Sequence, residues 1–349
     1  MGKKAAASPA AANVVFCFPD ISRAHDAAKN AILGAAIGDA VGLQSEGSTP
    51  SALEEGRGIA YPYRGAFRGY APNDWTDATD TAVLVMRAYG ARRQGSVPHG
   101  LAKRLKLWNA RGFPELGDVS GLTPESVVAR VLTVAEFASQ PTHVAAQLKG
   151  PKAENGSLLR SVACAFTAQP AVWGEALSLV THSDSRCTAA VRAYVGILNL
   201  LARTPRGAPL SPAAIMEPLL AGRGRISDPE AQKEYMTWVT DTKELGDLHL
   251  SHHATRSYVL KTLGCAVWAY RMLLRYPQRD ALFFSQVIGA VAREGGDSSA
   301  NCAVVGAVLG AAACELPEEW LNAAPHIDWL KKEVDAFLDE VVPTWRLER

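Results

Sequence analysis

Residues 302–313 constrain the fold more than any other part of the chain. This segment carries no charged side chain, and its only polar side chain is the thiol of Cys302. A helix that is apolar on all sides must be buried. Gly306 and Gly310 lie one helical turn apart, so a neighbouring helix can approach their backbone closely. We therefore expect residues 302–313 to form a central helix.

A second helix with regularly spaced glycines is predicted over residues 27–43. Gly34, Gly38 and Gly42 are spaced by four residues and share one face of this helix. Because a glycine costs about 1 kcal/mol in a helix interior, three on one face indicate that another backbone packs against them. The glycine face of the 302–313 helix is the natural partner.

The remaining sequence predicts an all-α protein with one domain. Apolar residues recur at helical spacing, and no segment shows the alternation typical of a strand. Residues 47–74 and 210–253 are predicted to be rich in loops. We expect a flexible N-terminal segment over residues 1–22 and one helical domain over residues 23–349. The other predicted helices cover residues 82–89, 101–110, 124–138, 155–167, 173–180, 187–203, 259–274, 282–293 and 326–342.

The composition argues against two classes of protein. Lys and Arg together number 36 against 35 for Asp and Glu, so we expect neither a nucleic-acid nor a membrane-surface binder. No run reaches the roughly 18 apolar residues of a transmembrane helix. Six scattered cysteines without a C-x-x-C pair indicate a reducing compartment. We expect a cytoplasmic or nuclear protein.

Side-chain oxygens cluster at two predicted helix starts. Five of the six positions over residues 76–81 carry one, whereas capping a helix needs only one. Hard cations such as Mg²⁺ prefer clustered oxygen ligands. Gly295-Gly296-Asp297 opens the central helix, although this triplet is also common in simple turns. Asp39 lies inside the 27–43 helix, where a carboxylate must be paired or bound to a cation.

Two other polar segments could contact a ligand. The glycine-bearing loop over residues 149–157 opens a helix and could present backbone amides to an anion. His182 lies in a turn between two helices. A lone histidine in such a turn is more often structural than catalytic, and the sequence leaves both roles open.

Taken together and in order, these segments resemble the ADP-ribosylglycohydrolase family. This family includes the dinitrogenase reductase-activating glycohydrolases, the ADP-ribosyl-acceptor hydrolases and certain lens crystallins. The similarity extends from Lys29 to Cys314. Its motifs are residues 34–42 with Glu46, 75–79, 155–160, 181–182, 257–259 and 295–297.

The resemblance implies an orthogonal helical bundle with a cleft that holds two Mg²⁺ ions. The substrate would be ADP-ribose or an ADP-ribosylated protein. The residues that match the catalytic positions are Glu46, Asp77 and Asp297. Those that match substrate-binding positions are Asn155, Gly156, Ser157, His182, Gly295 and Gly296.

The chain departs from the family pattern at the metal ligands. Ala78 and Ser299 stand where the family has aspartates, and Ala300 stands where it has a threonine. Two Mg²⁺ ions bring four positive charges, whereas Asp77 and Asp297 supply two negative ones. We therefore expect at most one Mg²⁺ ion, completed by water. The residues that would hold it are Thr76, Asp77, Asp297 and Ser299.

Two further carboxylates bear on the site. Glu154 stands where the family has a small residue beside a phosphate, so it is predicted to weaken pyrophosphate binding. Asp80 lies about 200° around a regular helix from Ala78. It could replace the missing aspartate only if the helix start shifted.

The sequence leaves two functions open. In the first, the protein hydrolyses an N- or O-glycosidic bond to ADP-ribose with at most one Mg²⁺ ion, and Glu46 acts as general acid or base. In the second, it is a catalytically inactive relative that binds ADP-ribose or serves as a structural protein. The loss of three metal ligands favours the second function, and the retained acidic residues favour the first.

Overall fold

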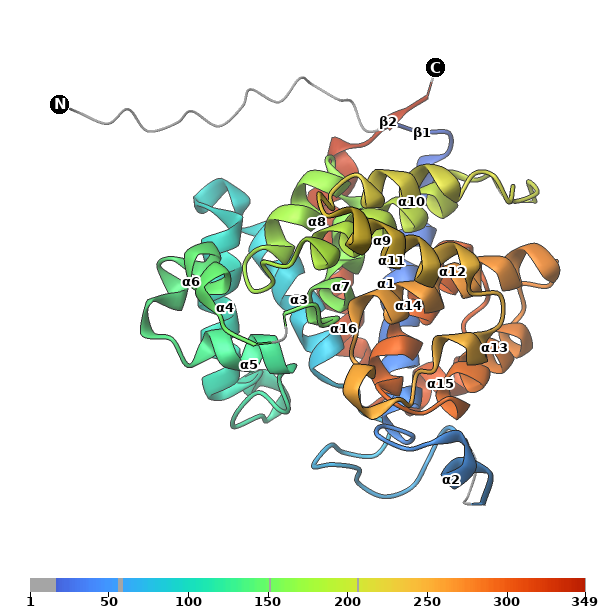
Figure 1. Ribbon diagram of the computed structural model, residues 1–349, viewed down its shortest axis with the longest axis horizontal. Helices are drawn as coiled ribbons and strands as arrows, with labels where there is room; N and C mark the ends of the chain where they lie inside the picture. Colours follow the sequence, from blue (N-terminus) through green and yellow to red (C-terminus); the bar gives the residue numbers. More distant parts are fainter. Residues whose placement is uncertain (1–16, 56–58, 151, 206, 349) are drawn as a thin grey trace.

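Two helices form the centre of the molecule. The computed structural model describes residues 17–55, 59–150, 152–205 and 207–348. Helices α1 (Ile21–Leu43) and α14 (Ser298–Ala311) lie side by side in its middle (Figure 1). A Cβ atom at Gly38 would collide with the carbonyl of Cys302, and one at Gly306 would collide with the carbonyl of Gly34. The predicted packing of the two glycine faces is confirmed.

The start of α1 differs from the prediction. The helix begins at Ile21 rather than at residue 27, because the Asp20 carboxylate accepts a hydrogen bond from the Arg23 amide at 3.0 Å and caps it. Within the predicted N-terminal segment, residues 1–16 lie outside the described residues. Cys17–Phe18 form the short strand β1, which pairs in parallel with β2 (Arg346–Leu347) and brings the two ends of the described chain together.

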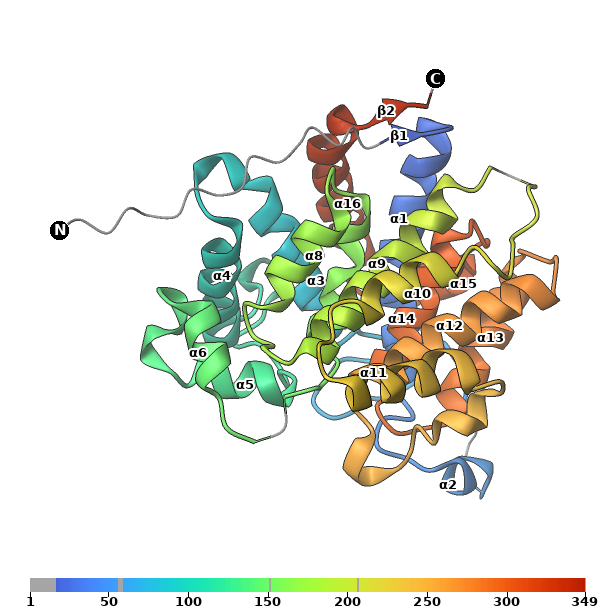
Figure 2. The same cartoon turned by 45° about the horizontal axis from the view of Figure 1, so that its top comes forward.

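Helices surround the central pair on all sides. Both views place α4, α5 and α6 on one flank of α1, and α12, α13 and α15 on the other (Figures 1 and 2). The bounds of the first group are α2 (Pro50–Glu55), α3 (Asp77–Gly90), α4 (Val97–Arg111), α5 (Ser126–Leu132), α6 (Pro141–Gln147), α7 (Gly156–Leu159) and α8 (Pro170–Ser178). The second group is α9 (Ser185–Arg203), α10 (Met216–Arg223), α11 (Pro229–Met236), α12 (Val259–Arg275), α13 (Ala281–Arg293), α15 (Glu318–Ala323) and α16 (Ile327–Val341).

The prediction of one all-α domain is confirmed, with local corrections. Residues 155–167 form α7 and then a 3₁₀ segment, Arg160–Phe166, rather than one helix. The segment 210–253 contains α10 and α11, so it holds more helix than its polar composition indicated. Asp228 caps α11 and Pro229 occupies its first turn. Within the described ranges, none of the helices combines the length and hydropathy that a membrane crossing requires.

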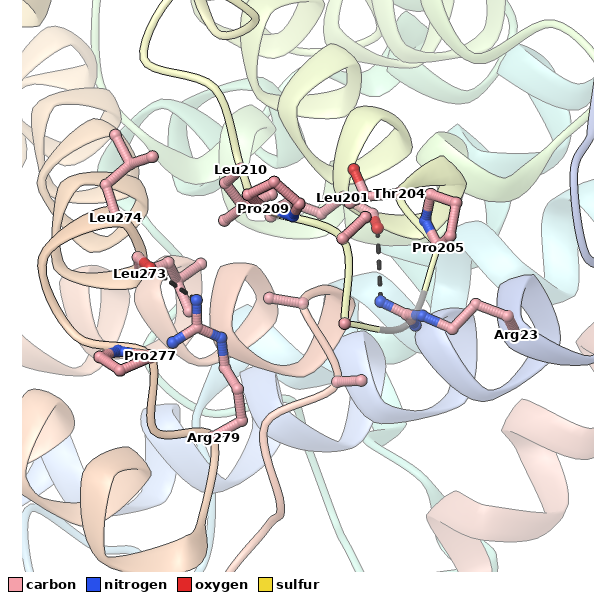
Figure 3. Close-up of a pocket in the computed structure, with 14 residues that line it drawn as sticks. Arg23, Leu201, Thr204, Pro205, Pro209, Leu210, Leu273, Leu274, Pro277 and Arg279 are labelled. Carbon is pink, nitrogen blue, oxygen red and sulfur yellow. Dashed lines mark hydrogen bonds between the residues drawn. The ribbon is translucent and has the colours of Figure 1, made fainter.

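A cavity of about 550 Å³ lies where three helices end (Figure 3). Arg23 donates to the carbonyls of Leu201, at the end of α9, and Ala311, at the end of α14, at 3.3 and 2.9 Å. Arg279 donates to the carbonyl of Leu273, near the end of α12, at 2.6 Å. Carbonyls in the last turn of a helix lack partners within it. The two arginines therefore serve as structural caps.

The glycine contact yields a stability prediction. Gly38→Ala should destabilise the fold by about 3 kcal/mol or more, because the added methyl group meets the backbone of α14, which cannot move alone. Gly90→Ala is the matched control, since no atom lies within 4 Å of a Cβ placed there. Urea unfolding of both variants checks this. Equal stability of Gly38→Ala and the wild type would contradict the close contact.

Candidate active site

Residues from several of the motifs meet around a cavity of about 220 Å³. Its wall is built from the chain that follows α1, the start of α3, the start of α7 and the start of α14. Among the residues predicted for catalysis, metal binding and substrate binding, those that line it are Glu46, Thr76, Asp77, Asn155, Asp297 and Ser299.

Asp39 holds the start of α3 against α1. Its carboxylate is fully buried and accepts hydrogen bonds from the hydroxyls of Thr76 and Thr79, both at 2.7 Å. The backbone amides of the same two threonines donate to it at 3.0 and 3.1 Å. Burial nevertheless raises the pKa of Asp39 to about 6. The buried Asp39 is therefore paired by hydrogen bonds, and Thr76 donates its hydroxyl proton to it.

Asp77 follows Thr76 and faces the cavity. Its Oδ2 accepts a hydrogen bond from the Glu125 amide at 2.9 Å. Burial raises the pKa of Asp77 well above its usual value, and the charges of Asp39, Glu125 and Asp297 raise it further. Asp77 thus lies in a cavity that disfavours its negative charge.

Asp80 cannot replace the carboxylate that is missing at residue 78. Its two oxygens accept hydrogen bonds from the indole nitrogens of Trp75 and Trp108, at 3.0 and 2.9 Å. It does not line the cavity. Burial raises the pKa of Asp80 to about 8, so at neutral pH its side chain is largely protonated.

The glycines of the Gly-Gly-Asp turn shape the backbone at the start of α14. Gly295 and Gly296 have φ angles of 65° and 70°, which favour glycine. Side chains there would collide with the carbonyls of Ser48 and Leu250. Neither glycine lines the cavity. The turn places Asp297, whose Oδ2 accepts a hydrogen bond from Asn155 Nδ2 at 2.9 Å.

Glu46 and Ser299 bind each other. The Ser299 amide and hydroxyl both donate to Glu46 Oε2, at 3.1 and 3.0 Å. Burial and the nearby charge of Asp297 raise the pKa of Glu46 to about 8. Glu46 therefore caps the start of α14, and it is largely protonated at neutral pH.

The predicted substrate-binding residues fall into two groups. Asn155 lines the cavity, and its Oδ1 is buried without a hydrogen-bond partner. Gly156, Ser157 and His182 lie behind the cavity wall. Gly156 leaves room for Glu125, Ser157 accepts a hydrogen bond from Ser178 at 3.0 Å, and His182 Nε2 lies 3.4 Å from Glu125 Oε2. These three support the wall from within the protein.

Several lining residues escaped the sequence analysis. Glu125 caps α5 and also faces the cavity, and capping gives no sequence signal for a second role. Arg68 and Tyr70 did not escape it: they belong to the aromatic stretch 61–70 of the loop 47–74, for which the sequence leaves open a ligand-stacking rim or an irregular surface loop. Arg256 also lines the cavity and makes no ion pair among the described residues. Arg256 directly precedes Ser257, the first residue of the motif at residues 257–259, and this position is the sequence feature that points to Arg256 as a site residue.

The residues at the family's metal positions do not fit two Mg²⁺ ions. The Thr76 hydroxyl is bound to Asp39, the Ser299 hydroxyl to Glu46, and Asp297 to Asn155. Ala78 and Ala300 offer no side-chain oxygen. In the part of the chain that the structure describes, no group of three or more His, Cys, Asp or Glu side chains could hold a metal ion.

Comparisons with other proteins agree with the fold and the family. A solved structure described as an ADP-ribosylglycohydrolase-related protein complex superposes with a TM-score of 0.62, at 22% sequence identity over 91% of this chain and 99% of that one. A search among proteins with curated descriptions found no match. The sequence model of the ADP-ribosylglycohydrolase family matches residues 20–346. The chain belongs to the ADP-ribosylglycohydrolase family.

Proposed function

We propose that this protein binds an ADP-ribosyl group in the 220 Å³ cavity without the pair of Mg²⁺ ions that the family resemblance implies. One observation carries the proposal: Ala78 and Ala300 offer no side-chain oxygen, so the metal positions hold two carboxylates, Asp77 and Asp297, against the four charges of two Mg²⁺ ions. Burial raises the pKa of Glu46, Asp77 and Asp297, so protons can neutralise the acidic groups where metal ions would otherwise be needed.

Two groups in the cavity support a ligand of this kind. Asn155 is only 1% exposed, and its free Oδ1 can accept a hydrogen bond from a ribose hydroxyl. The Arg256 guanidinium has no ion-pair partner among the described residues and suits a phosphate group. Buried polar atoms are rarely left without partners, so Asn155 favours a ligand over a purely structural cavity.

The cavity is joined by a second compartment that could hold the rest of the ligand. A pocket of about 380 Å³ shares Ser126, Glu154, Arg256 and Ser257 with the first. The Ser126 hydroxyl donates to Glu154 at 2.5 Å. Burial and the nearby Glu125 raise the pKa of Glu154 to about 7, which lessens its repulsion of a phosphate at neutral pH. ADP-ribose would span both compartments.

A second candidate function is hydrolysis of an ADP-ribosyl bond with one Mg²⁺ ion. Asp77 and Asp297 line the same cavity as Glu46, which favours this function. The ion would be held by Thr76, Asp77, Asp297 and Ser299. The Thr76 and Ser299 hydroxyls donate their protons to Asp39 and Glu46, which leaves an oxygen lone pair of each hydroxyl for the ion. Release of free ADP-ribose from ADP-ribosylated protein, with and without Mg²⁺, tests this candidate.

Calorimetric titration with ADP-ribose in the presence of a chelator tests the main proposal. We expect binding without metal, and Arg256→Gln should weaken it about tenfold because one charge-assisted contact is lost. Arg275→Gln, an exposed site on α12, is the matched control. Binding only with Mg²⁺ would support the second candidate instead. No binding under either condition would indicate a structural protein.

Restoring the family ligands tests the assignment of the metal positions. The triple variant Ala78→Asp, Ser299→Asp, Ala300→Thr should bind Mg²⁺ at least tenfold more tightly than the wild type, since it adds two carboxylates and a hydroxyl to Asp77 and Asp297. Calorimetry with Mg²⁺ measures this gain. An unchanged affinity in a folded variant would show that these positions do not surround a common point.

The protonation of Glu46 can be measured through stability. A carboxyl group with a raised pKa binds more protons in the folded than in the unfolded protein, so stability falls as the pH rises from its ordinary pKa of 4.5 to about 8. Glu46→Gln removes this contribution. Its urea stability relative to the wild type should increase from pH 5 to pH 8. Glu319→Gln, on an exposed helix, should show no such change, and parallel curves for Glu46→Gln would contradict the raised pKa.

A further inference from the structure

A groove of about 530 Å³ lies beside α4 and shares no lining residue with the candidate active site. One wall is α4 itself, which contains Lys103, Arg104, Lys106 and Arg111 and no acidic residue. All of these except Lys106 line the groove. We call this feature the basic groove and define it by Arg87, Lys103, Arg104, Leu107, Arg111 and Phe113.

The positive charge of the basic groove is only partly balanced by the protein, through Glu115 in its lining and Glu333 beside it. Arg87, at its edge, is held by Glu333 at 2.6 Å and by Glu115 at 2.7 Å. Lys103, Arg104 and Arg111 make no ion pair among the described residues. These three cations remain available to an outside carboxylate.

Arg104 shows that like charges are crowded in the groove. Its guanidinium donates to the carbonyl of Gly100 at 3.2 Å, one turn earlier in α4. Burial lowers the pKa of Arg104, and the positive charge of Arg87 lowers it further. A carboxylate placed between α4 and Arg87 would relieve this repulsion.

An apolar surface lies among the cations. Leu107 is 55% exposed and projects from the same face of α4 as Lys103 and Arg111, which lie one turn before and after it. The buried rings of Trp108 and Phe113 also line the groove. Arg87 stacks over the Phe113 ring at 5.0 Å, which fixes this side of the groove. A ligand that fits both features carries negative charge and an apolar side chain.

We propose that the basic groove docks an acidic segment of a partner protein, with an apolar side chain over Leu107 and carboxylates at Lys103, Arg104 and Arg111. Charge complementarity identifies this occupant. The chain's own residues 1–16 contain two lysines and no acidic residue, so their charge does not match. A nucleic acid would supply negative charge but no aliphatic side chain for Leu107.

Fluorescence anisotropy with a labelled peptide tests the proposal, using the full chain and a peptide with glutamates on both sides of a leucine. We expect salt-sensitive binding that Lys103→Glu/Arg104→Glu weakens at least tenfold. Lys233→Glu/Lys243→Glu, which makes the same charge change at exposed sites elsewhere, should bind as the wild type does. Leu107→Ala should also weaken binding, whereas Leu282→Ala, at another exposed leucine, should not.

Three results would overturn the proposal: no binding of the peptide, equal binding by the Lys103→Glu/Arg104→Glu variant, or tighter binding of a single-stranded oligonucleotide than of the peptide. Thermal unfolding of each variant establishes that it is folded. Titration with ADP-ribose should give the same affinity in the wild type and in Lys103→Glu/Arg104→Glu. The docking proposal for the groove and the binding proposal for the cavity are therefore tested independently.

Discussion

The contact between the backbones of α1 and α14 determines where every other part of the site can lie. Gly42 faces Ser298, Gly38 faces Cys302 and Gly34 faces Gly306, so the two helices run antiparallel. The end of α1 therefore meets the start of α14, and Ser298 donates to the Gly42 carbonyl at 2.8 Å. This register puts Glu46 against Ser299. Larger residues in place of the glycines would push α1 and α14 apart. Glu46 and Ser299, which line the cavity, would then also move apart.

Burial raises the pKa of the acidic groups in the cavity, which favours their protonated forms. Two Mg²⁺ ions would hold several carboxylates together by neutralising them. Ala78, Ser299 and Ala300 stand at three positions that the family resemblance assigns to metal ligands, and burial raises the pKa of Glu46, Asp77 and Asp297. Hydrogen bonds to Glu46 and Asp297 then fix their positions. In the proposed binding site, hydrogen bonds therefore connect residues at the positions that the family resemblance assigns to metal ligands.

The central helices could be predicted from the sequence, because glycine spacing depends on residues close together in the chain. The cleft and its residues were expected only from the family resemblance. The predicted positions of Asn155, Asp77 and Asp297 in one cavity agree with the structure. Other features depend on distant contacts. His182 lies behind Glu125 only because α5 packs against the turn before α9, and Asp80 binds Trp108 because α4 packs against α3. Sequence patterns among neighbouring residues do not predict contacts between segments that are distant in the chain.

The hydrogen-bond partners separate residues that the fold itself needs from residues that await a ligand. Asp39 fixes the start of α3, Glu46 caps α14, and Glu125 caps α5. These structural roles account for the three carboxylates without a catalytic role. Asn155 Oδ1 and the Arg256 guanidinium have no such explanation, since the fold leaves the first without a hydrogen bond and the second without an ion pair among the described residues. Both line the cavity, one offering an acceptor and the other a positive charge. A ligand with hydroxyls and phosphates would satisfy both, and this is the main support for the proposed ADP-ribosyl binding site.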